Sequence, residues 1–329
     1  MTYPKIAISM GDPAGIGPEV ILKALAKLEN SRFQPVVIGS RAHLKETYKH
    51  LKIKGIKNLQ DPERFEIHDF PITGKVILGR GNPSTGAASF GCLTIATELV
   101  LKGYCNSLVT APIAKHLWLE AGHRYSGQTE RLAELVGVPG ASMLFTAKSP
   151  KNHWRLNTIL ATTHIPISQI CKQLTEQLIS TKLSTLLSFC RQFTPKPHLV
   201  VAGLNPHAGE LNQLGKEEHE WLIPLLDQWQ QEHPEVKLEG PLAPDTCWLG
   251  AGQAWAGENK GPDGYLALYH DQGLIPVKLL AFDMAVNVSL GLPFLRTSPD
   301  HGTGFGIASE GIARSTSMEA AIITAHELG

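Results

Sequence analysis

The sequence predicts an α/β protein with a largely parallel sheet. Short apolar, β-branched runs of about four to seven residues alternate with amphipathic stretches of helical length. Strands that alternate with helices build parallel sheets through crossover connections. The 329 residues leave room for two domains at roughly 150 residues each. Because no repeat, low-complexity tract or long linker interrupts the alternation, we expect these domains to interleave.

The apolar runs place the strands, and they read KIAISM, PVVIG, SLVTAP, TILATTH, HLVVAGLN, YLALYH and AVNVSL in chain order. Apolar residues at helical spacing predict a helix in EVILKALAKL, another over 91–102, and one or two over 167–193. A further helix is expected over 216–232, where Trp221 and Trp229 recur at helical spacing although Pro224 falls inside. We interpret these tryptophans as core or subunit contacts, not as ligand-stacking surfaces.

The charge balance excludes two classes of partner. Thirty basic and thirty acidic residues give a formal net charge of zero, which argues against a general basic field for nucleic acid and against a polybasic membrane anchor. No run reaches the roughly 18 apolar residues that a membrane-spanning helix needs, so we expect a cytoplasmic protein. The five cysteines lack a CxxC pair and are interpreted as reduced thiols.

Three histidines each follow an apolar strand: His164 in ILATTHIP, His207 in LVVAGLNPHAGE and His270 in GYLALYHDQGLIPVK. One such histidine alone would simply bond a loop. Ligands in open α/β sheets bind beyond the carboxyl ends of strands, so three imidazoles there can converge on one point. Three neutral imidazoles leave coordination positions open for a substrate, as in a catalytic zinc site.

Two polar segments suggest anion binding. Lys278, Asn287 and Arg296 lie at the ends of apolar segments in a region with few other charges, and such groups bind phosphate. The stretch 126–130, which contains Gln128 and Thr129, reads as a helix start, and it is either an ordinary cap or an anion site.

Two glycine-rich loops give weaker signals. The loop in KIAISMGDPAGIGPEV is either a tight strand-to-helix turn or a loop beside a ligand, and it lacks the GxGxxG pattern. The loop SPDHGTGFGIASEG at 298–311 could wrap a nucleotide with its backbone amides and stack an adenine against Phe305.

Taken in order, MGDPAGIGPEV, LNPHAGE, GPLAPDTCW, YHDQGLIPVK and VNVSLGLPFLRTSPDHGTGF resemble the 4-hydroxythreonine-4-phosphate dehydrogenase family of vitamin B6 biosynthesis. The match runs from about Lys5 to the carboxyl terminus. GIGPEV and HGTGF are also similar to segments of the isocitrate and isopropylmalate dehydrogenases, whose dinucleotide site lacks GxGxxG. The resemblance implies two interleaved α/β domains, 1–125 with 286–329 and 126–285, with the active site in the cleft between them.

The resemblance also implies a homodimer whose partner subunit completes the active site, a divalent metal and a nicotinamide cofactor. Zinc suits three histidines, with magnesium, cobalt, nickel or manganese as alternatives. The implied site residues are metal ligands His164, His207 and His270; substrate contacts Gln128, Thr129, Lys278, Asn287 and Arg296; cofactor contacts His301, Gly302, Thr303 and Phe305; and candidate bases Asp245 and Asp271.

Two positions depart from the family pattern. Gln128 stands where the family usually has histidine, so we do not expect this position to supply the general base. The loop continues as GIASEG over 306–311 where the family has DIAGKG, which leaves the choice between NAD and NADP open.

The resemblance implies oxidation of a phosphorylated four-carbon hydroxy amino acid by NAD or NADP, followed by loss of CO2. The hypotheses kept beside it are a dehydrogenase of phosphorylated threonate or erythronate, and a non-catalytic protein that binds sugar phosphates.

Overall fold

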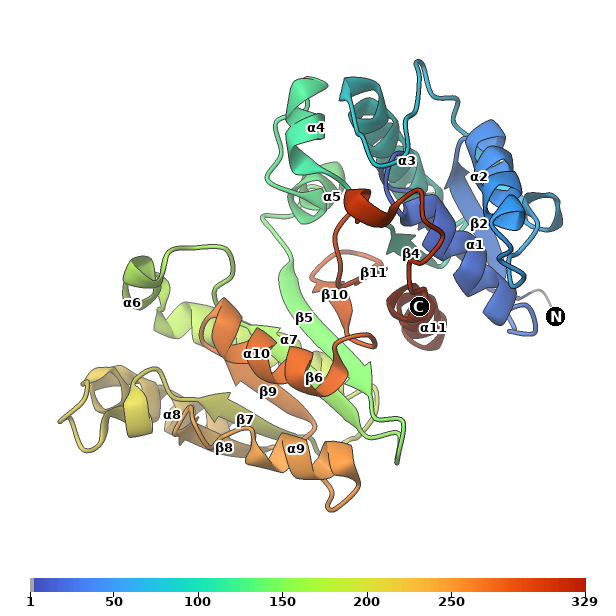
Figure 1. Ribbon diagram of the computed structural model, residues 1–329. Coiled ribbons are helices and arrows are strands. Elements are labelled where there is room, and N and C mark those ends of the chain that lie inside the picture. The colour runs from blue at the N-terminus through green and yellow to red at the C-terminus, as the bar shows by residue number, and fades with distance from the viewer. Residues whose placement is uncertain (1–2) are drawn as a thin grey trace. The chain divides into compact units, whose positions relative to one another are not determined.

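The computed structural model describes residues 3–329, and their contacts divide them into two compact units (Figure 1). Unit 1 comprises the described residues up to Ala141 together with Val286–Gly329, and unit 2 is Ser142–Ala285. The chain therefore leaves the first unit and returns to it. The contacts place 126–141 in unit 1, whereas the sequence-based division, 1–125 with 286–329 and 126–285, stays a prediction.

Unit 1 contains six strands in the order β3-β2-β1-β4-β11-β10. All neighbours in this order are parallel except β10 and β11, which are antiparallel. Apolar side chains on both faces of β1 and β2 are buried, as expected for inner strands of a covered parallel sheet. The strands are β1 (Lys5–Ser9), β2 (Gln34–Gly39), β3 (Glu66–Asp69), β4 (Ser107–Thr110), β10 (Val286–Leu290) and β11 (Leu295–Pro299).

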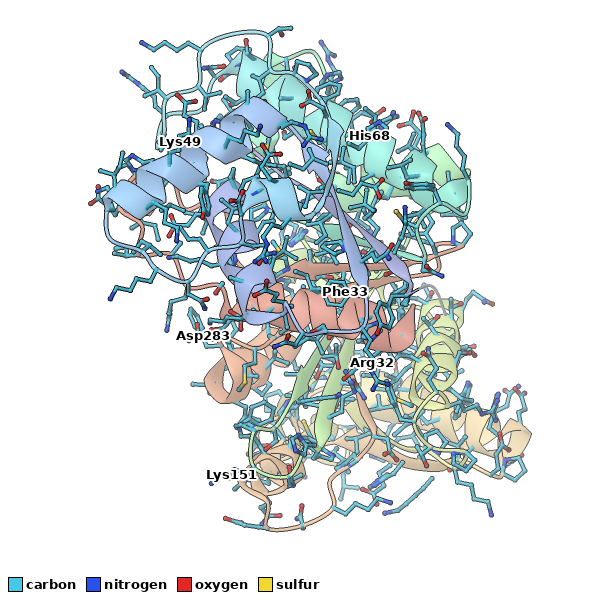
Figure 2. All side chains as sticks on the ribbon, turned by 90° about the vertical axis from the view of Figure 1, so that its right-hand side faces the viewer. Arg32, Phe33, Lys49, His68, Lys151 and Asp283 are labelled. Atoms are coloured by element: carbon cyan, nitrogen blue, oxygen red, sulfur yellow. The ribbon has the colours of Figure 1, made fainter. Side chains whose placement is uncertain are left out.

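Six α-helices accompany this sheet, and their starts follow local chemistry. Pro18 lies in the first turn of α1, and Asn82 caps α3 in a reciprocal pair with Thr85. Helix α2 presents the exposed Lys49 on its outer side (Figure 2). The helices are α1 (Gly17–Lys27), α2 (Arg41–Ile53), α3 (Pro83–Leu101), α4 (Lys115–Glu120), α5 (Gln128–Val136) and α11 (Thr316–Leu328).

Helix α3 corrects the expectation that no segment is long and apolar enough to cross a membrane. By length and composition alone it could cross a membrane, and among residues 3–329 no other helix meets that test. Half of its apolar window is buried, and Cys92, Leu93 and Ala96 have no exposed surface in the core of unit 1. Its contacts with β1 and β2 explain its composition, because the central helix of a folded unit is apolar for the same reason as a membrane span.

Unit 2 contains five strands in the order β5-β6-β9-β7-β8. The pair β5 and β6 is antiparallel, and the remaining neighbours are parallel. The strands are β5 (Ser142–Lys148), β6 (Arg155–Leu160), β7 (His198–Ala202), β8 (Lys237–Leu242) and β9 (Gly264–Ala267). The α-helices are α6 (Ile170–Gln173), α7 (Glu176–Cys190), α8 (Ile223–Glu232), α9 (Leu249–Ala256) and α10 (His270–Ala281).

The helix boundaries differ from those expected where capping residues intervene. The stretch 167–193 forms two α-helices, because Thr175 accepts a hydrogen bond from Leu178 N and starts α7 anew. The stretch 216–232 begins as a π-helical turn, Glu218–Leu222, and becomes α-helical at Ile223. Pro224 is the second residue of the α-helical part, which directly follows the π-helical turn.

The structure agrees with the interpretation of the cysteines as reduced thiols. All five are free thiols, and only Cys171 is exposed. Burial raises the pKa of Cys92 and of Cys247 to about 12, so neither is a thiolate at neutral pH.

Candidate active site

The three strands that precede the predicted histidines are neighbours in unit 2. They are β6, β9 and β7, paired in parallel in that order, so their carboxyl ends lie at one edge of the sheet. His164 follows β6, His270 follows β9 and His207 follows β7. The topology therefore brings the three strand ends to one edge of the sheet.

Two of the imidazoles lie together. The ring centroids of His164 and His270 are 5.3 Å apart, with the rings tilted by 45°. His270 is the first residue of α10, and its Nδ1 is 2.7 Å from Oδ1 of Asp271. A carboxylate on one ring nitrogen fixes the tautomer and leaves the other nitrogen, Nε2, available to a ligand.

The third imidazole lies on an unusual turn. His207 has φ 51° and ψ 29°, and Ala208, Glu210, Leu211 and Asn212 also have positive φ. Left-handed backbone costs a non-glycine residue about 1–2 kcal/mol, so five such residues need support from their surroundings.

The described residues, 3–329, contain no group of three or more His, Cys, Asp or Glu side chains close enough to hold a metal ion. The structure thus brings His164 and His270 together but does not bring His207 to them. The three-histidine ligand set stays a prediction.

Buried side chains tie the loops beyond these strands to one another. The Thr162 hydroxyl donates to the Leu268 carbonyl at 2.8 Å, which joins the loops that carry His164 and His270. Gln272, 7% exposed, accepts from Leu268 N at 2.7 Å and donates through Nε2 to the Gly203 carbonyl at 2.6 Å. Its amide therefore joins the His270 segment to the segment that leads to His207.

The other predicted site residues of unit 2 lie on α10 and on the loop before α9. Lys278 lies two turns along α10 from His270, with its ammonium 5.8 Å from the ring centroid of Phe282. Asp271 is the hydrogen-bond partner of His270, and its side chain is 71% exposed. Asp245 is exposed on the loop before α9.

Arg296 is the central charge of the predicted anion site in unit 1. It lies on β11 and is 3% exposed. Its Nε and Nη2 donate to the Thr110 hydroxyl at 3.1 and 2.7 Å, and Nη1 donates to the Ser289 hydroxyl at 3.1 Å. Burial lowers the pKa of Arg296 to about 10, and the charge of Glu130 opposes this shift, so Arg296 is a cation at neutral pH.

Several predicted substrate contacts lie near this arginine in unit 1. Asn287 lies two residues before Ser289 on β10, so both project from the same face. Gln128 and Thr129 open α5, and Gln128 Nε2 donates to the Ala111 carbonyl at 3.2 Å, next to Thr110. The buried oxygens Gln128 Oε1 and Asn287 Oδ1 have no hydrogen-bond partner among the described residues.

The two glycine-rich loops of unit 1 pack against each other. Ile16 N donates to the Thr303 carbonyl at 2.8 Å. A Cβ on Gly15 would come within 2.6 Å of that same carbonyl oxygen, so only glycine permits this approach. The first loop therefore acts as a support for the predicted cofactor loop.

Glu19 extends this support along the second loop. It is 2% exposed, and its Oε1 accepts from Ala313 N at 2.9 Å and from Lys23 Nζ at 2.6 Å. Lys23 also donates to the carbonyls of Gly311 and Ala313, at 2.9 and 2.8 Å. This ion pair fixes the segment on which the cofactor loop ends.

The segment that departs from the family pattern is bound to α2. His50 Nε2 is 3.0 Å from the Ser309 carbonyl, and Lys54 Nζ is 3.8 Å from Glu310. His301, the first predicted cofactor contact, has a buried Nε2 without a partner among the described residues. Phe305 packs beside Gly81, where a Cβ would come within 3.0 Å of its ring.

Sequence reasoning missed Thr110, Ser289, Glu19 and Gln272. Glu19 gives a usable signal, since it is an acidic residue in the first turn of a largely buried helix. The others carry none, because Arg296 bonds to hydroxyls on the two neighbouring strands and Gln272 bonds to a backbone carbonyl, contacts that no local sequence pattern marks.

Replacing Thr110 tests the support of Arg296. Thr110→Val keeps the side-chain shape but removes the acceptor for two guanidinium N–H groups, and we expect the free energy of unfolding to fall by about 2 kcal/mol. Thr97→Val is the matched control, because the hydrogen bond found for this buried hydroxyl goes to the Leu93 carbonyl of its own helix. Urea denaturation measures both, and equal losses would show that Arg296 does not depend on Thr110.

Comparisons with known proteins agree with this architecture. The family model for "Pyridoxal phosphate biosynthetic protein PdxA" matches residues 31–325. A 4-hydroxythreonine-4-phosphate dehydrogenase of Synechococcus sp. (strain RCC307) is 57% identical over 328 residues, which cover 99% of each chain. One of Synechocystis sp. (strain ATCC 27184 / PCC 6803 / Kazusa) is 49% identical over 337 residues, with 100% of this chain and 96% of the relative covered.

Solved structures extend the likeness. A 4-hydroxythreonine-4-phosphate dehydrogenase from Klebsiella pneumoniae has a TM-score of 0.81 at 35% identity and covers 99% of this chain and 98% of its own. Isocitrate dehydrogenase from Methylococcus capsulatus, with a TM-score of 0.50 and 14% identity over 98% of this chain and 85% of its own, shares the fold alone. The chain belongs to the PdxA family of pyridoxal phosphate biosynthetic proteins.

Proposed function

We propose that this protein oxidises 4-phosphooxy-L-threonine with NAD or NADP in pyridoxal 5′-phosphate biosynthesis. The product, 2-amino-3-oxo-4-phosphooxybutanoate, is a β-keto acid that loses CO2 to give 3-amino-2-oxopropyl phosphate. The observation that carries this proposal is the 57% identity over 99% of both chains to a relative with that named activity.

The buried Arg296 supports binding of an anionic substrate. A guanidinium that is 3% exposed is costly unless it is paired, and the hydrogen bonds found for it go to two neutral hydroxyls. Arginine binds phosphate and carboxylate groups through paired N–H donors. We assign Arg296 to an anionic end of the substrate and Lys278 to a second contact.

The amide oxygens beside Arg296 suit the neutral and cationic parts of the substrate. Gln128 Oε1 and Asn287 Oδ1 are buried acceptors without a partner among residues 3–329. A hydroxyl or ammonium group would donate to them and remove the cost of an unsatisfied buried oxygen. Thr129, the next residue of α5, adds a hydroxyl at the same helix start.

Two of the three predicted histidines of unit 2 lie together, which supports a divalent metal site there. His164 and His270 already lie side by side, and Asp271 holds the His270 ring as carboxylates hold metal-binding histidines. We propose His164, His207 and His270 as the ligands, with zinc favoured and cobalt, nickel, manganese or magnesium as alternatives. Such an ion supplies Lewis acidity, which lowers the pKa of an alcohol and stabilises negative charge on its oxygen.

The supported loop of unit 1 is our proposed cofactor site. The nicotinamide cofactor supplies the hydride acceptor. His301, Gly302, Thr303 and Phe305 are the proposed contacts, and the backbone of Thr303 is fixed by Ile16. Asp245 and Asp271 remain the candidate bases, and the bond to His270 favours an orienting role for Asp271.

A homodimer is the proposed assembly, in the cytoplasm. Helix α10 leaves an apolar stripe uncovered, with Ile275 60%, Leu279 81% and Phe282 62% exposed. Exposed apolar patches of this kind mark contacts with other chains. The same helix carries His270 and Lys278, which supports a partner subunit close to these residues.

A substrate panel tests the proposed activity. We expect NADH or NADPH formation with 4-phosphooxy-L-threonine, and a much lower kcat/KM with erythronate 4-phosphate or threonate 4-phosphate, which lack the amino group. Preference for either acid would identify the related dehydrogenase instead. No turnover and no dinucleotide binding with any of them would identify a non-catalytic protein.

The ligand assignment predicts the behaviour of His207→Ala. Loss of one imidazole should abolish turnover and metal retention together while the protein stays folded. His219→Ala is the matched control, an exposed histidine on the following helical turn. Metal analysis, kinetics and circular dichroism measure the three properties. Stoichiometric metal and near-normal activity in His207→Ala would refute the assignment.

The close approach of Gly15 to the Thr303 carbonyl predicts that a larger residue at position 15 weakens cofactor binding. Gly15→Ala should displace the Thr303 carbonyl and weaken NADH binding about tenfold, which corresponds to about 1.4 kcal/mol. Gly306→Ala should bind normally, because no atom lies within 4 Å of a Cβ there. NADH fluorescence titration compares the two variants, and equal affinities would contradict a cofactor site on this loop.

A further inference from the structure

A buried carboxylate, that of Glu218, is bonded to the segment that leads to His207. The backbone between β7 and α8, which contains both residues, is drawn in yellow in Figure 1. Glu218 has no exposed surface. Its Oε1 accepts from the backbone N–H groups of Leu204 and Asn205, at 2.8 and 2.7 Å, and its Oε2 accepts from Asn205 Nδ2 at 2.8 Å. Three donors from two adjacent residues therefore converge on one side chain.

These donors need that partner because β7 has ended. The strand stops at Ala202, and Leu204 and Asn205 follow it with no β-ladder to satisfy their amides. A buried N–H without an acceptor is strongly unfavourable. A carboxylate accepts several such bonds at once, and bonds to a charged acceptor are shorter and stronger than neutral ones.

The turn beyond Asn205 also packs against the same carboxylate. A Cβ on Gly209 would come within 3.0 Å of Glu218 Oε2, so the backbone passes directly over it. His207 lies between Asn205 and Gly209 and has left-handed backbone dihedrals. The strained residues are therefore held at two points, and Glu218 is at both.

The neighbouring Glu217 shares one donor with Glu218 and accepts a second bond from Lys216 N. Its Oε2 is also 2.8 Å from Asn205 Nδ2, but no bond to a backbone amide of the turn is found for it. Gln272 binds the Gly203 carbonyl from the other side, which connects the base of the turn to the His270 segment. Glu218 is the member of this set that faces the turn itself.

We propose that Glu218 is a positioning residue for His207. It holds the backbone from which the imidazole projects. The proposal rests on the metal site proposed above. Residues that orient ligands in this way typically change metal affinity by about 10–100-fold when they are replaced.

The test compares Glu218→Ala, Glu218→Gln and the control Glu220→Gln, an exposed glutamate on the same helical turn. Co²⁺ alone is titrated into each metal-free protein, and amide hydrogen exchange is followed over 204–212. We expect Glu218→Ala to raise the Co²⁺ dissociation constant at least tenfold and to speed exchange in the turn. Glu218→Gln, which keeps one acceptor oxygen, should restore part of both properties, and Glu220→Gln should match the parent protein.

The remaining outcomes distinguish failure of the proposed role of Glu218 from failure of the proposed metal site. Parental Co²⁺ affinity and parental exchange in Glu218→Ala would overturn the proposal, as would an equal loss in Glu220→Gln. If Glu218→Ala does not fold, the same criteria apply to Glu218→Gln. If the parent protein does not bind Co²⁺, the proposed metal site fails, whereas faster exchange in the Glu218 variants would still show that this carboxylate holds the turn.

Discussion

Parallel pairing of β6, β9 and β7 is the constraint on which the candidate metal site depends. It brings three strand ends to one edge and leaves the backbone groups beyond them without a ladder. Buried polar side chains provide hydrogen-bond partners for those groups. Gln272 accepts from Leu268 N and donates to the Gly203 carbonyl, and Glu218 accepts from the two backbone amides that follow β7. The same hydrogen bonds that make the sheet edge stable also determine where the histidine-bearing loops begin.

In unit 1, the predicted anion site contains one buried guanidinium, that of Arg296. The chain as a whole carries no net charge. A zero balance excludes attraction of a polyanion at long range, but it does not prevent recognition of a small anion. We propose that Arg296, which is hydrogen-bonded to the hydroxyls of Thr110 and Ser289, provides that recognition locally.

Much of this was predictable from sequence periodicity, and the misses have physical causes. Apolar runs followed by histidine placed His164, His207 and His270 beyond strand ends, where side chains from several parallel strands can converge. That these strands are neighbours came from the structure. Helix boundaries were less predictable where a cap such as Thr175 restarts a helix. The structural roles of Gln272 and Glu218 could not be predicted. Each side chain binds backbone groups of the segment after β7, and backbone groups carry no residue signature.

We propose that His164, His207 and His270 hold one divalent metal at this sheet edge. X-ray absorption spectroscopy of the Zn²⁺-loaded protein tests this ligand set, because scattering from imidazole rings reports how many histidines coordinate the ion. We expect one ion per chain with three imidazole ligands, falling to two in His207→Ala. Fewer than three imidazoles in the parent protein, or an unchanged spectrum in the variant, would contradict it.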